Sequence, residues 1–342
     1  MNPRAITLLR RAAPLVPSAL KGPLRRAFGE VARTQVMRRL AVLAEGQAPI
    51  VAGPWLGEVG FELLYWVPFL NWFAEEFGIA PERIIAMSRG GTRDWYRGVA
   101  ARYRDAFDQI STEEFRERNA GRAAELGEQK QIAETQFERD LLAPVLAADG
   151  ISDGHVLYPS MMYTLMRPYW WGHAGIDWVD RHTRYRTFGP PSPVAALESL
   201  PATYAAVKFY YSESFPPTSA NRAVAQDVVA RLRDEGPVVS LSTGLDLDDH
   251  QSWEDEEDLA AHGIPASLSP ADNLALQSAV VGRARVWAGT YGGFAYLAPF
   301  YGVRAEALFS VPGGFSERHL SLARHVFARL SDNELLRVSR AA

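Results

Sequence analysis

The segment from Val286 to Ala298 constrains the fold of this chain most strongly. Its residues predict an apolar strand, a glycine-rich turn at 289–293 and a helix, in that order. Glycine has no Cβ, so such a turn bends tightly and lets the backbone approach a ligand. The first N–H groups of the following helix have no partner within that helix and favour an anion. The segment therefore predicts a phosphate- or diphosphate-bearing ligand, with close strand–helix packing as the structural alternative.

Strand, glycine-rich loop and helix recur along the chain. Glycine loops follow the first two predicted strands, and helices are expected over 61–77, from about 93, over 218–234 and over 273–283. The predicted strands are 48–53, 83–88, 155–158, 204–211, 237–241, 285–288 and 307–311. This alternation is typical of parallel α/β sheets.

We expect two Rossmann-like α/β domains that face each other across a cleft, preceded by a basic helical arm. A length of 342 residues suffices for two domains, and a proline-rich stretch at 189–193 predicts a linker. The predicted parts are a basic arm at 1–46, an acceptor-side domain at 47–195 with an exposed helical insertion at 112–147, and a donor-nucleotide domain at 196–342.

Composition excludes several classes of site. The chain has no cysteine, which rules out disulfides, thiolate nucleophiles and cysteine-bound zinc or iron–sulfur clusters. An acidic run at 242–250 contains His250, but its spacing does not match a calcium loop and no second histidine lies nearby. We therefore expect no metal. With no apolar run of membrane-spanning length and no secretory signal, a cytoplasmic location is expected.

The charge of the arm allows two interpretations. Residues 1–45 contain nine Arg or Lys and two Glu, a net charge of +7, against −4 for the whole chain. The arm either contacts an anionic membrane surface at the inner face of the membrane or is a solvated helix packed on the body. Nucleic acid is not expected as a partner, because the rest of the chain is acidic.

Lys208 is one of three lysines among 33 arginines and lies in the predicted strand at 204–211. We expect Lys208 to lie at the same edge of the sheet as the glycine turn. Its ammonium group would there neutralise a diphosphate, and the hydroxyl of Ser212 or Ser214 would donate hydrogen bonds to it. Glu213 is also expected among the donor contacts. The alternative is a lysine that extends into water.

Thr243 and Gly244 follow the strand at 237–241 and are expected to contact a nucleoside or ribose. They would lie at the same edge of the sheet as the glycine turn. A solvated acidic loop is the alternative for this run.

Gly57 and Glu58 lie in a glycine-punctuated loop after the first predicted strand. A carboxylate at Glu58 would take a proton from an attacking hydroxyl, and Glu62 is its competitor one turn later. Charge pairing at a helix N-terminus explains both glutamates without catalysis.

Two further features are candidates for binding the acceptor. Arg89 and Gly90 begin a second glycine turn that suits an anion, and contact with the donor phosphate across the cleft is the alternative to acceptor binding. Trp170 lies in an aromatic stretch at 163–178, where rings stack on sugars or pack in a core, and core packing is the alternative.

Three segments together carry a family resemblance: Pro270–Ser278, Gly289–Phe294 and Leu297–Val303. They resemble the donor half of GT-B glycosyltransferases over roughly residues 200–325, and the Gly57–Glu58 loop is similar to the acceptor-side loop of such enzymes. The resemblance implies that Thr290, Tyr291, Gly292 and Gly293 contact the diphosphate of a nucleotide sugar. The chain departs from many members at Tyr291 and Ala298, where they carry acidic residues.

The predicted function is transfer of a sugar from a nucleotide-sugar donor to a glycan, lipid-linked or other hydroxyl acceptor in surface polysaccharide assembly. We expect inversion, with Glu58 as base, no metal, and no cofactor apart from the nucleotide sugar as co-substrate. The alternatives are a non-catalytic nucleotide- or sugar-binding protein and another Rossmann-type nucleotide enzyme. An oxidoreductase is disfavoured because Gly-x-Gly-x-x-Gly does not follow the first strand.

Overall fold

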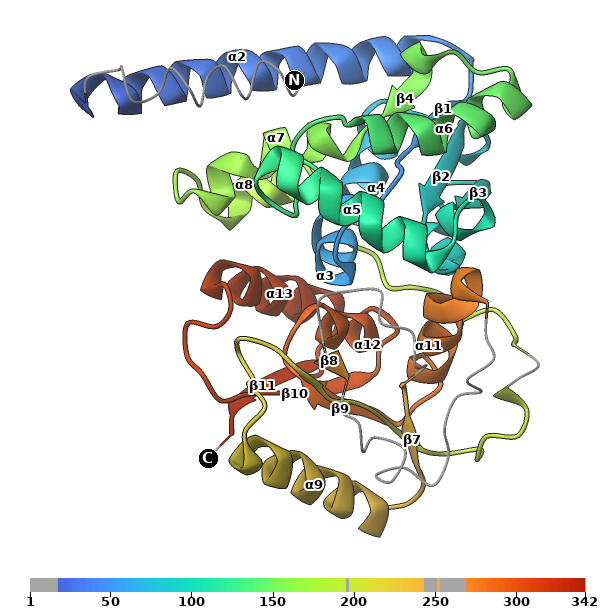
Figure 1. The fold of residues 1–342 in the computed structure, drawn as a ribbon, viewed down its shortest axis with the longest axis vertical. Helices are drawn as coiled ribbons and strands as arrows, with labels where there is room; N and C mark the ends of the chain where they lie inside the picture. Colours follow the sequence, from blue (N-terminus) through green and yellow to red (C-terminus); the bar gives the residue numbers. More distant parts are fainter. Residues whose placement is uncertain (1–17, 195–196, 243–250, 253–268, 342) are drawn as a thin grey trace. The chain divides into compact units, whose positions relative to one another are not determined.

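The computed structural model describes residues 18–194, 197–242, 251–252 and 269–341 (Figure 1). The chain divides into two compact units, and each contains one parallel sheet. The first unit comprises residues up to 57, 65–89 and 98–184, and the second comprises 58–64, 90–97 and those from 185 onward. The two parallel sheets with their helices form the α/β class that the alternation predicts.

The sheet of the first unit has the order β3-β2-β1-β4. Its strands are β1 (Ile50–Ala52), β2 (Ile84–Ser88), β3 (Arg102–Asp105) and β4 (Val156–Leu157). Every residue of β1 and β2 is buried, as expected for central strands of a parallel sheet. The sequence did not predict β3.

The helices of the first unit include the segment expected as an exposed insertion. They are α2 (Ser18–Glu45), α4 (Val67–Glu76), α5 (Thr112–Leu126), α6 (Gln136–Asp149), α7 (Pro159–Trp170) and α8 (Ile176–Arg181), with short turns η3 (Pro81–Arg83), η5 (Ala106–Asp108) and η6 (Asp153–His155). Helices α5 and α6 each bury one face, and Phe115, Phe137 and Leu141 join the core with Val51 of β1. These two helices therefore belong to the packed body of the unit.

The C-terminal end of α2 is fastened to the first unit. The guanidinium of Arg83 donates hydrogen bonds to the carbonyl oxygens of Leu43 (3.1 Å), Ala44 (3.0 Å) and Ala48 (3.3 Å). A cation at this end satisfies carbonyls that have no partner within the helix and opposes the negative end of its dipole. Helix α2 also packs against α7.

The sheet of the second unit has the order β11-β10-β9-β5-β7. Its strands are β5 (Ala205–Lys208), β7 (Val238–Ser240), β9 (Val286–Thr290), β10 (Arg304–Phe309) and β11 (Leu336–Arg340). The central strand β9 is entirely buried and pairs Gly289 with Lys208 of β5. A separate antiparallel pair is formed by β6 (Tyr210–Tyr211) and β8 (Gln251–Ser252).

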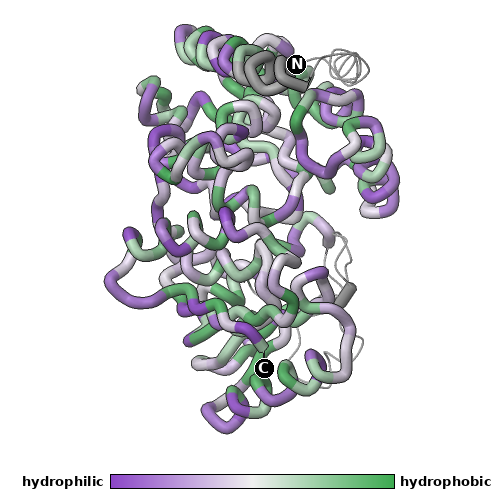
Figure 2. Tube along the Cα trace, turned by 90° about the vertical axis from the view of Figure 1, so that its left-hand side faces the viewer, coloured by the Kyte–Doolittle hydropathy of each residue, from purple (hydrophilic) through white to green (hydrophobic). Residues whose placement is uncertain are grey.

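Helical segments alternate with strands along the second unit. They are α3 (Val59–Phe61), η4 (Thr92–Tyr96), α9 (Ser219–Asp234), η8 (Pro270–Asp272), α11 (Asn273–Val281), η9 (Gly293–Tyr296), α12 (Leu297–Phe300) and α13 (Glu317–Leu330), and a π-helix η2 (Glu62–Trp66) follows α3. Hydrophobic and hydrophilic residues are mixed along the tube of Figure 2. The α helix expected from about residue 93 is the short 3-10 helix η4.

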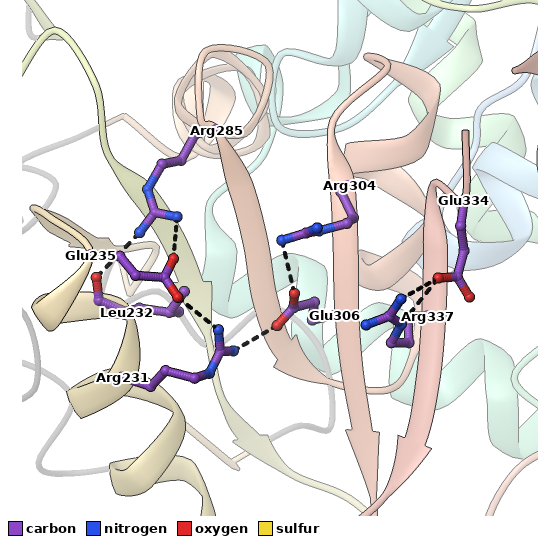
Figure 3. Close-up of polar contacts among 8 residues, drawn as sticks. All are labelled: Arg231, Leu232, Glu235, Arg285, Arg304, Glu306, Glu334 and Arg337. Carbon is purple, nitrogen blue, oxygen red and sulfur yellow. Dashed lines mark hydrogen bonds and ion pairs between the residues drawn. The ribbon is translucent and has the colours of Figure 1, made fainter. Parts of the chain in front are cut away.

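A chain of ion pairs joins α9 to the sheet (Figure 3). Arg231 of α9 pairs with Glu235 at 3.2 Å and with Glu306 of β10 at 2.7 Å. Arg285 and Arg304 extend the chain at 2.7 and 3.1 Å to the same two carboxylates. Because each pair includes a side chain that is 44–49% exposed, solvent screens it and each pair adds little stability, so the network mainly fixes the position of α9.

No helix of the described ranges is long and apolar enough to cross a bilayer.

Candidate functional site

The glycine turn that follows β9 is shorter than the sequence predicts. Strand β9 continues through Gly289 to Thr290, so the bend begins only at Tyr291. The helical segment after it consists of the four residues of η9 and the four of α12. A helix this short has a small dipole, so a strong field from its N-terminus is not available to hold an anion.

The glycines of this segment are required by close packing. A Cβ at Gly289 would collide with the carbonyl oxygen of Lys208, and one at Gly292 would collide with the hydroxyl of Tyr210. A Cβ at Gly293 would lie 2.5 Å from the backbone nitrogen of Gly60. The packing alternative therefore explains all three glycines, and Gly293 is the first residue of η9, whose N–H has no partner inside that helix.

The side chains of Thr290 and Tyr291 are engaged inside the protein. Thr290 Oγ1 donates to the carbonyl oxygen of Tyr210 at 2.8 Å and accepts from the N–H of Tyr210 at 3.0 Å. The hydroxyl of Tyr291 bonds that of Tyr296 at 2.7 Å, and burial raises the pKa of Tyr291 to about 12. The polar side-chain atoms of both residues are therefore bonded within the protein, as is the N–H of Tyr291, which donates to the carbonyl oxygen of Leu308 at 2.7 Å.

The side chain of Lys208, at the end of β5, lies against neighbouring residues and does not extend straight into water. Its ammonium donates to Oε1 of Gln277 at 2.6 Å and lies 4.3 Å from the ring centroid of Phe294. Gln277 is buried in α11, and its Nε2 donates to Oδ1 of Asn273 at 2.9 Å. The ammonium of Lys208 is thus positioned by Gln277, which Asn273 holds in place, and by the ring of Phe294.

The loop of the predicted base meets the glycine turn within the second unit. A Cβ at Gly60 would lie 2.6 Å from Cα of Gly293, so the two backbones are in direct contact. Glu58 is exposed and precedes α3 in extended conformation. Because two residues span about 7 Å at most, Glu58 lies close to this contact.

Glu62, the competitor of Glu58, is buried. Its Oε1 accepts hydrogen bonds from the hydroxyls of Tyr96 at 2.5 Å and Thr92 at 3.4 Å. These bonds fix Glu62 within the π-helix η2, a type of segment that is frequent at functional sites. Of the two glutamates, Glu58 is the one accessible to a substrate.

The serines near Lys208 bond to one another. Oγ of Ser212 lies 2.9 Å from Oγ of Ser214, and Ser214 Oγ donates to the carbonyl oxygen of Tyr291 at 3.3 Å. Glu213 between them is exposed. This loop therefore packs directly against the turn after β9.

The candidates for acceptor binding lie in different places. Arg89 is buried in the first unit, where its Nη2 donates to the carbonyl oxygen of Gly57 at 3.0 Å. Trp170 of the same unit packs edge-on to Tyr65 with ring centroids 5.1 Å apart. Gly90 belongs to the second unit, and its carbonyl oxygen accepts from the first N–H groups of α11. Arg89 and Gly90 thus contribute to the structure of the loops they lie in.

Thr243 and Gly244 lie outside the described residues. Within the ranges that the structure does describe, no group of three potential ligands could hold a metal ion.

Sequence reasoning missed Gln277, Asn273 and Phe294. A signal was present, because Asn273 and Gln277 are one turn apart in an otherwise apolar helix. Polar side chains at helical spacing on a buried helix need partners, and here they form a chain that ends at Lys208.

No protein-family model matches the sequence, and no curated protein matches it. The solved structures that are similar to this chain include two glycosyltransferases. One is a glycosyl transferase of family 9 from Veillonella parvula DSM 2008, 12% identical with a TM-score of 0.39, with 86% of each chain covered. The other is the ADP-heptose LPS heptosyltransferase II of E. coli, 13% identical with a TM-score of 0.43, covering 86% of this chain and 90% of that one. Likeness at this level assigns neither the fold nor the activity, so the functional argument rests on the residues of the site.

Proposed function

We propose that the protein is a glycosyltransferase that takes a sugar from a nucleotide-sugar donor and passes it to a hydroxyl of a glycan or lipid-linked acceptor in surface polysaccharide assembly. The donor diphosphate lies beside Lys208 and the backbone of Gly292 and Gly293. The loop of Ser212 and Glu213 and the segment with Thr243 and Gly244 complete the donor contacts.

The contact between Gly60 and Gly293 carries this proposal. It joins the loop of an accessible carboxylate, Glu58, to the turn whose next residue, Phe294, lies under the ammonium of Lys208. A base and a cation are the two groups that a direct displacement on a nucleotide sugar requires. They come from segments far apart in the sequence and belong to one compact unit.

The chemistry follows from these two groups. Glu58 accepts the proton of the acceptor hydroxyl as its oxygen attacks the anomeric carbon, and the bond from that carbon to the diphosphate oxygen breaks. Lys208 offsets the charge that develops on the leaving nucleoside diphosphate, the role that a metal ion has in other enzymes. A single displacement inverts the configuration at the anomeric carbon.

The test begins with a thermal-shift screen of the full chain against UDP, GDP, CMP and their sugars, because a ligand that binds the folded state raises the melting temperature. With the donor so identified, Glu58→Gln is compared with wild type for release of the nucleoside phosphate and for donor binding. We expect turnover to fall by about 100-fold or more, in line with loss of a general base, while donor affinity stays within about twofold.

Glu82→Gln is the control, since Glu82 is also an exposed glutamate and lies in the short helix η3. It should leave turnover unchanged. Full activity in Glu58→Gln would refute the assignment of the base, and binding without turnover in wild type would favour a non-catalytic binding protein.

A further inference from the structure

A buried side-chain amide holds the loop that leads to Glu58. Oε1 of Gln131 accepts a hydrogen bond from the N–H of Leu56 at 2.9 Å, and Nε2 of Gln131 donates to the carbonyl oxygen of Pro54 at 2.9 Å. Gln131 has no exposed surface, and Pro54 and Leu56 are also buried. Because water does not reach these two backbone groups, the amide satisfies them and fixes the path of the loop.

Gln131 is itself held on its other side. Its Nε2 also donates to Oε1 of Glu138 at 2.7 Å. Oε2 of Glu138 in turn accepts from the N–H and the hydroxyl of Thr135 at 2.7 and 2.9 Å, and both of these residues are buried. An amide nitrogen carries two hydrogens, so both are used and the amide has a single orientation.

Other backbone groups of the loop are engaged as well. The N–H of Trp55 donates to the carbonyl oxygen of Met87 at 2.9 Å, and Nη2 of Arg89 donates to that of Gly57 at 3.0 Å. Together with the bonds of the amide, these contacts run along the loop as far as Gly57, and Glu58 is the next residue. Glu58 is exposed, so the backbone that precedes it, and not a surrounding core, sets its position.

We propose that Gln131 is a positioning residue for Glu58. The inference rests on the proposed function, in which Glu58 is the base. By holding the backbone before Glu58, the amide keeps the carboxylate within reach of the acceptor hydroxyl, and a displacement of about 1 Å can cost about 100-fold in rate. The segment 112–147, expected as an exposed insertion, thereby acquires a role in the reaction, because Gln131 lies between its helices α5 and α6.

Gln131→Met tests this role, because methionine keeps the length of the side chain and loses the hydrogen bonds. Hydrogen–deuterium exchange of the full chain reports on the loop without any ligand. The amides of residues 55–57 should exchange at least about 10-fold faster than in wild type, since a buried hydrogen bond is lost. Turnover of the nucleotide sugar found in the thermal-shift screen should fall about 10-fold or more, while the affinity for its nucleoside diphosphate stays within about twofold.

Asn71→Leu is the matched control. Asn71 is also a buried amide of the first unit, and its Nδ2 donates to the carbonyl oxygen of Arg184 at 3.1 Å. This variant should lose stability and yet keep wild-type exchange at 55–57 and wild-type turnover. Unchanged exchange at 55–57 in Gln131→Met, or full turnover in that variant, would overturn the proposal.

A double variant separates an effect through Glu58 from a general effect on the fold. In the Glu58→Gln background, Gln131→Met should lower the remaining turnover by less than about twofold, because the base that it positions is already absent. A further loss of about 10-fold would overturn the proposal. Full activity of Glu58→Gln alone would refute the proposed base and this role with it, whereas an inactive Glu58→Gln beside a fully active Gln131→Met would refute only the role of Gln131.

Discussion

The ammonium of Lys208 and the side-chain amide of Gln277 are 2.6 Å apart, although the two residues are 69 positions apart in the sequence. The amide oxygen is a neutral acceptor, so it fixes the direction of the ammonium without cancelling its charge. Gln277 is in turn held by Asn273. We therefore regard Gln277 as a positioning residue for the cation.

Replacing Gln277 tests this role. Gln277→Ala removes one charge-assisted hydrogen bond and should raise the KM for the donor about 5- to 10-fold, and it should also lower kcat because Lys208 offsets charge on the leaving group. Gln277→Glu keeps an oxygen partner for the ammonium but neutralises its charge and cannot donate to Asn273, so it should bind the nucleoside diphosphate more weakly than Gln277→Ala. Steady-state kinetics, binding titrations and urea titrations measure the KM, the affinity and the stability of each variant.

Ser278→Ala is the control for this series. Ser278 is buried beside Gln277, and its hydroxyl accepts from Nε1 of Trp95 at 3.0 Å, away from Lys208. It should lower stability without raising the KM. If the KM rose in proportion to the loss of stability in all three variants, Ser278→Ala included, Gln277 would have only a structural role.

The contact of Gly60 with Gly293 predicts a steric effect. In Gly293→Ala the added methyl group meets backbone atoms of Gly60 at 2.5 Å, and backbone cannot move aside as a flexible side chain can. We expect the free energy of unfolding to fall by about 1–3 kcal/mol, as for overpacked sites. Urea denaturation measures the loss.

Gly121→Ala is the opposite case. A Cβ at Gly121 of α5 meets no atom within 4 Å, so alanine should raise stability by about 0.5–1 kcal/mol through its better helix propensity. If Gly293→Ala were as stable as wild type, the close approach of the two loops would be wrong.

Glu138 predicts a pH dependence of stability. Its burial raises the pKa above the ordinary 4.5, although hydrogen bonds from Gln131 and Thr135 act in the other direction. Between 4.5 and the raised pKa, the folded state binds more protons than the unfolded state, so the free energy of unfolding falls as pH rises through this window. Glu138→Gln removes that titration.

Urea midpoints measured from pH 4.5 to 8 check this sign. The free energy of unfolding of Glu138→Gln should rise relative to that of wild type as the pH rises. This trend is expected whether the variant is more or less stable than wild type at pH 4.5. Glu117→Gln, at an exposed position of α5, should run parallel to wild type. A parallel curve for Glu138→Gln would contradict the raised pKa.

The sequence predicted the buried strands well, because runs such as Ile84–Ser88 and Val286–Thr290 are mostly apolar and buried throughout. It missed β3, whose residues Arg-Tyr-Arg-Asp lack an apolar pattern because the strand lies at an edge of the sheet. The helix expected after the glycine turn consists of the 3-10 helix η9 and the four residues of α12.

The candidate site was predictable only in part. Strand ends in a parallel sheet meet at one edge, which is why Lys208 and the glycine turn could be associated from the order of elements. The partners that fix the cation, Gln277 and Phe294, depend on side-chain packing between distant segments. The engagement of Thr290 by Tyr210 likewise follows from the local path of β6, which no sequence pattern specifies.

The most direct measurement is calorimetric titration of the nucleoside diphosphate found in the thermal-shift screen into wild type, Lys208→Ala and Lys130→Ala. The account predicts about 10- to 150-fold weaker binding for Lys208→Ala, the loss of one hydrogen bond to a charged group worth about 1.5–3 kcal/mol. Lys130→Ala, which removes a lysine from the first unit, should bind like wild type. Wild-type affinity in a folded Lys208→Ala protein would contradict the donor site.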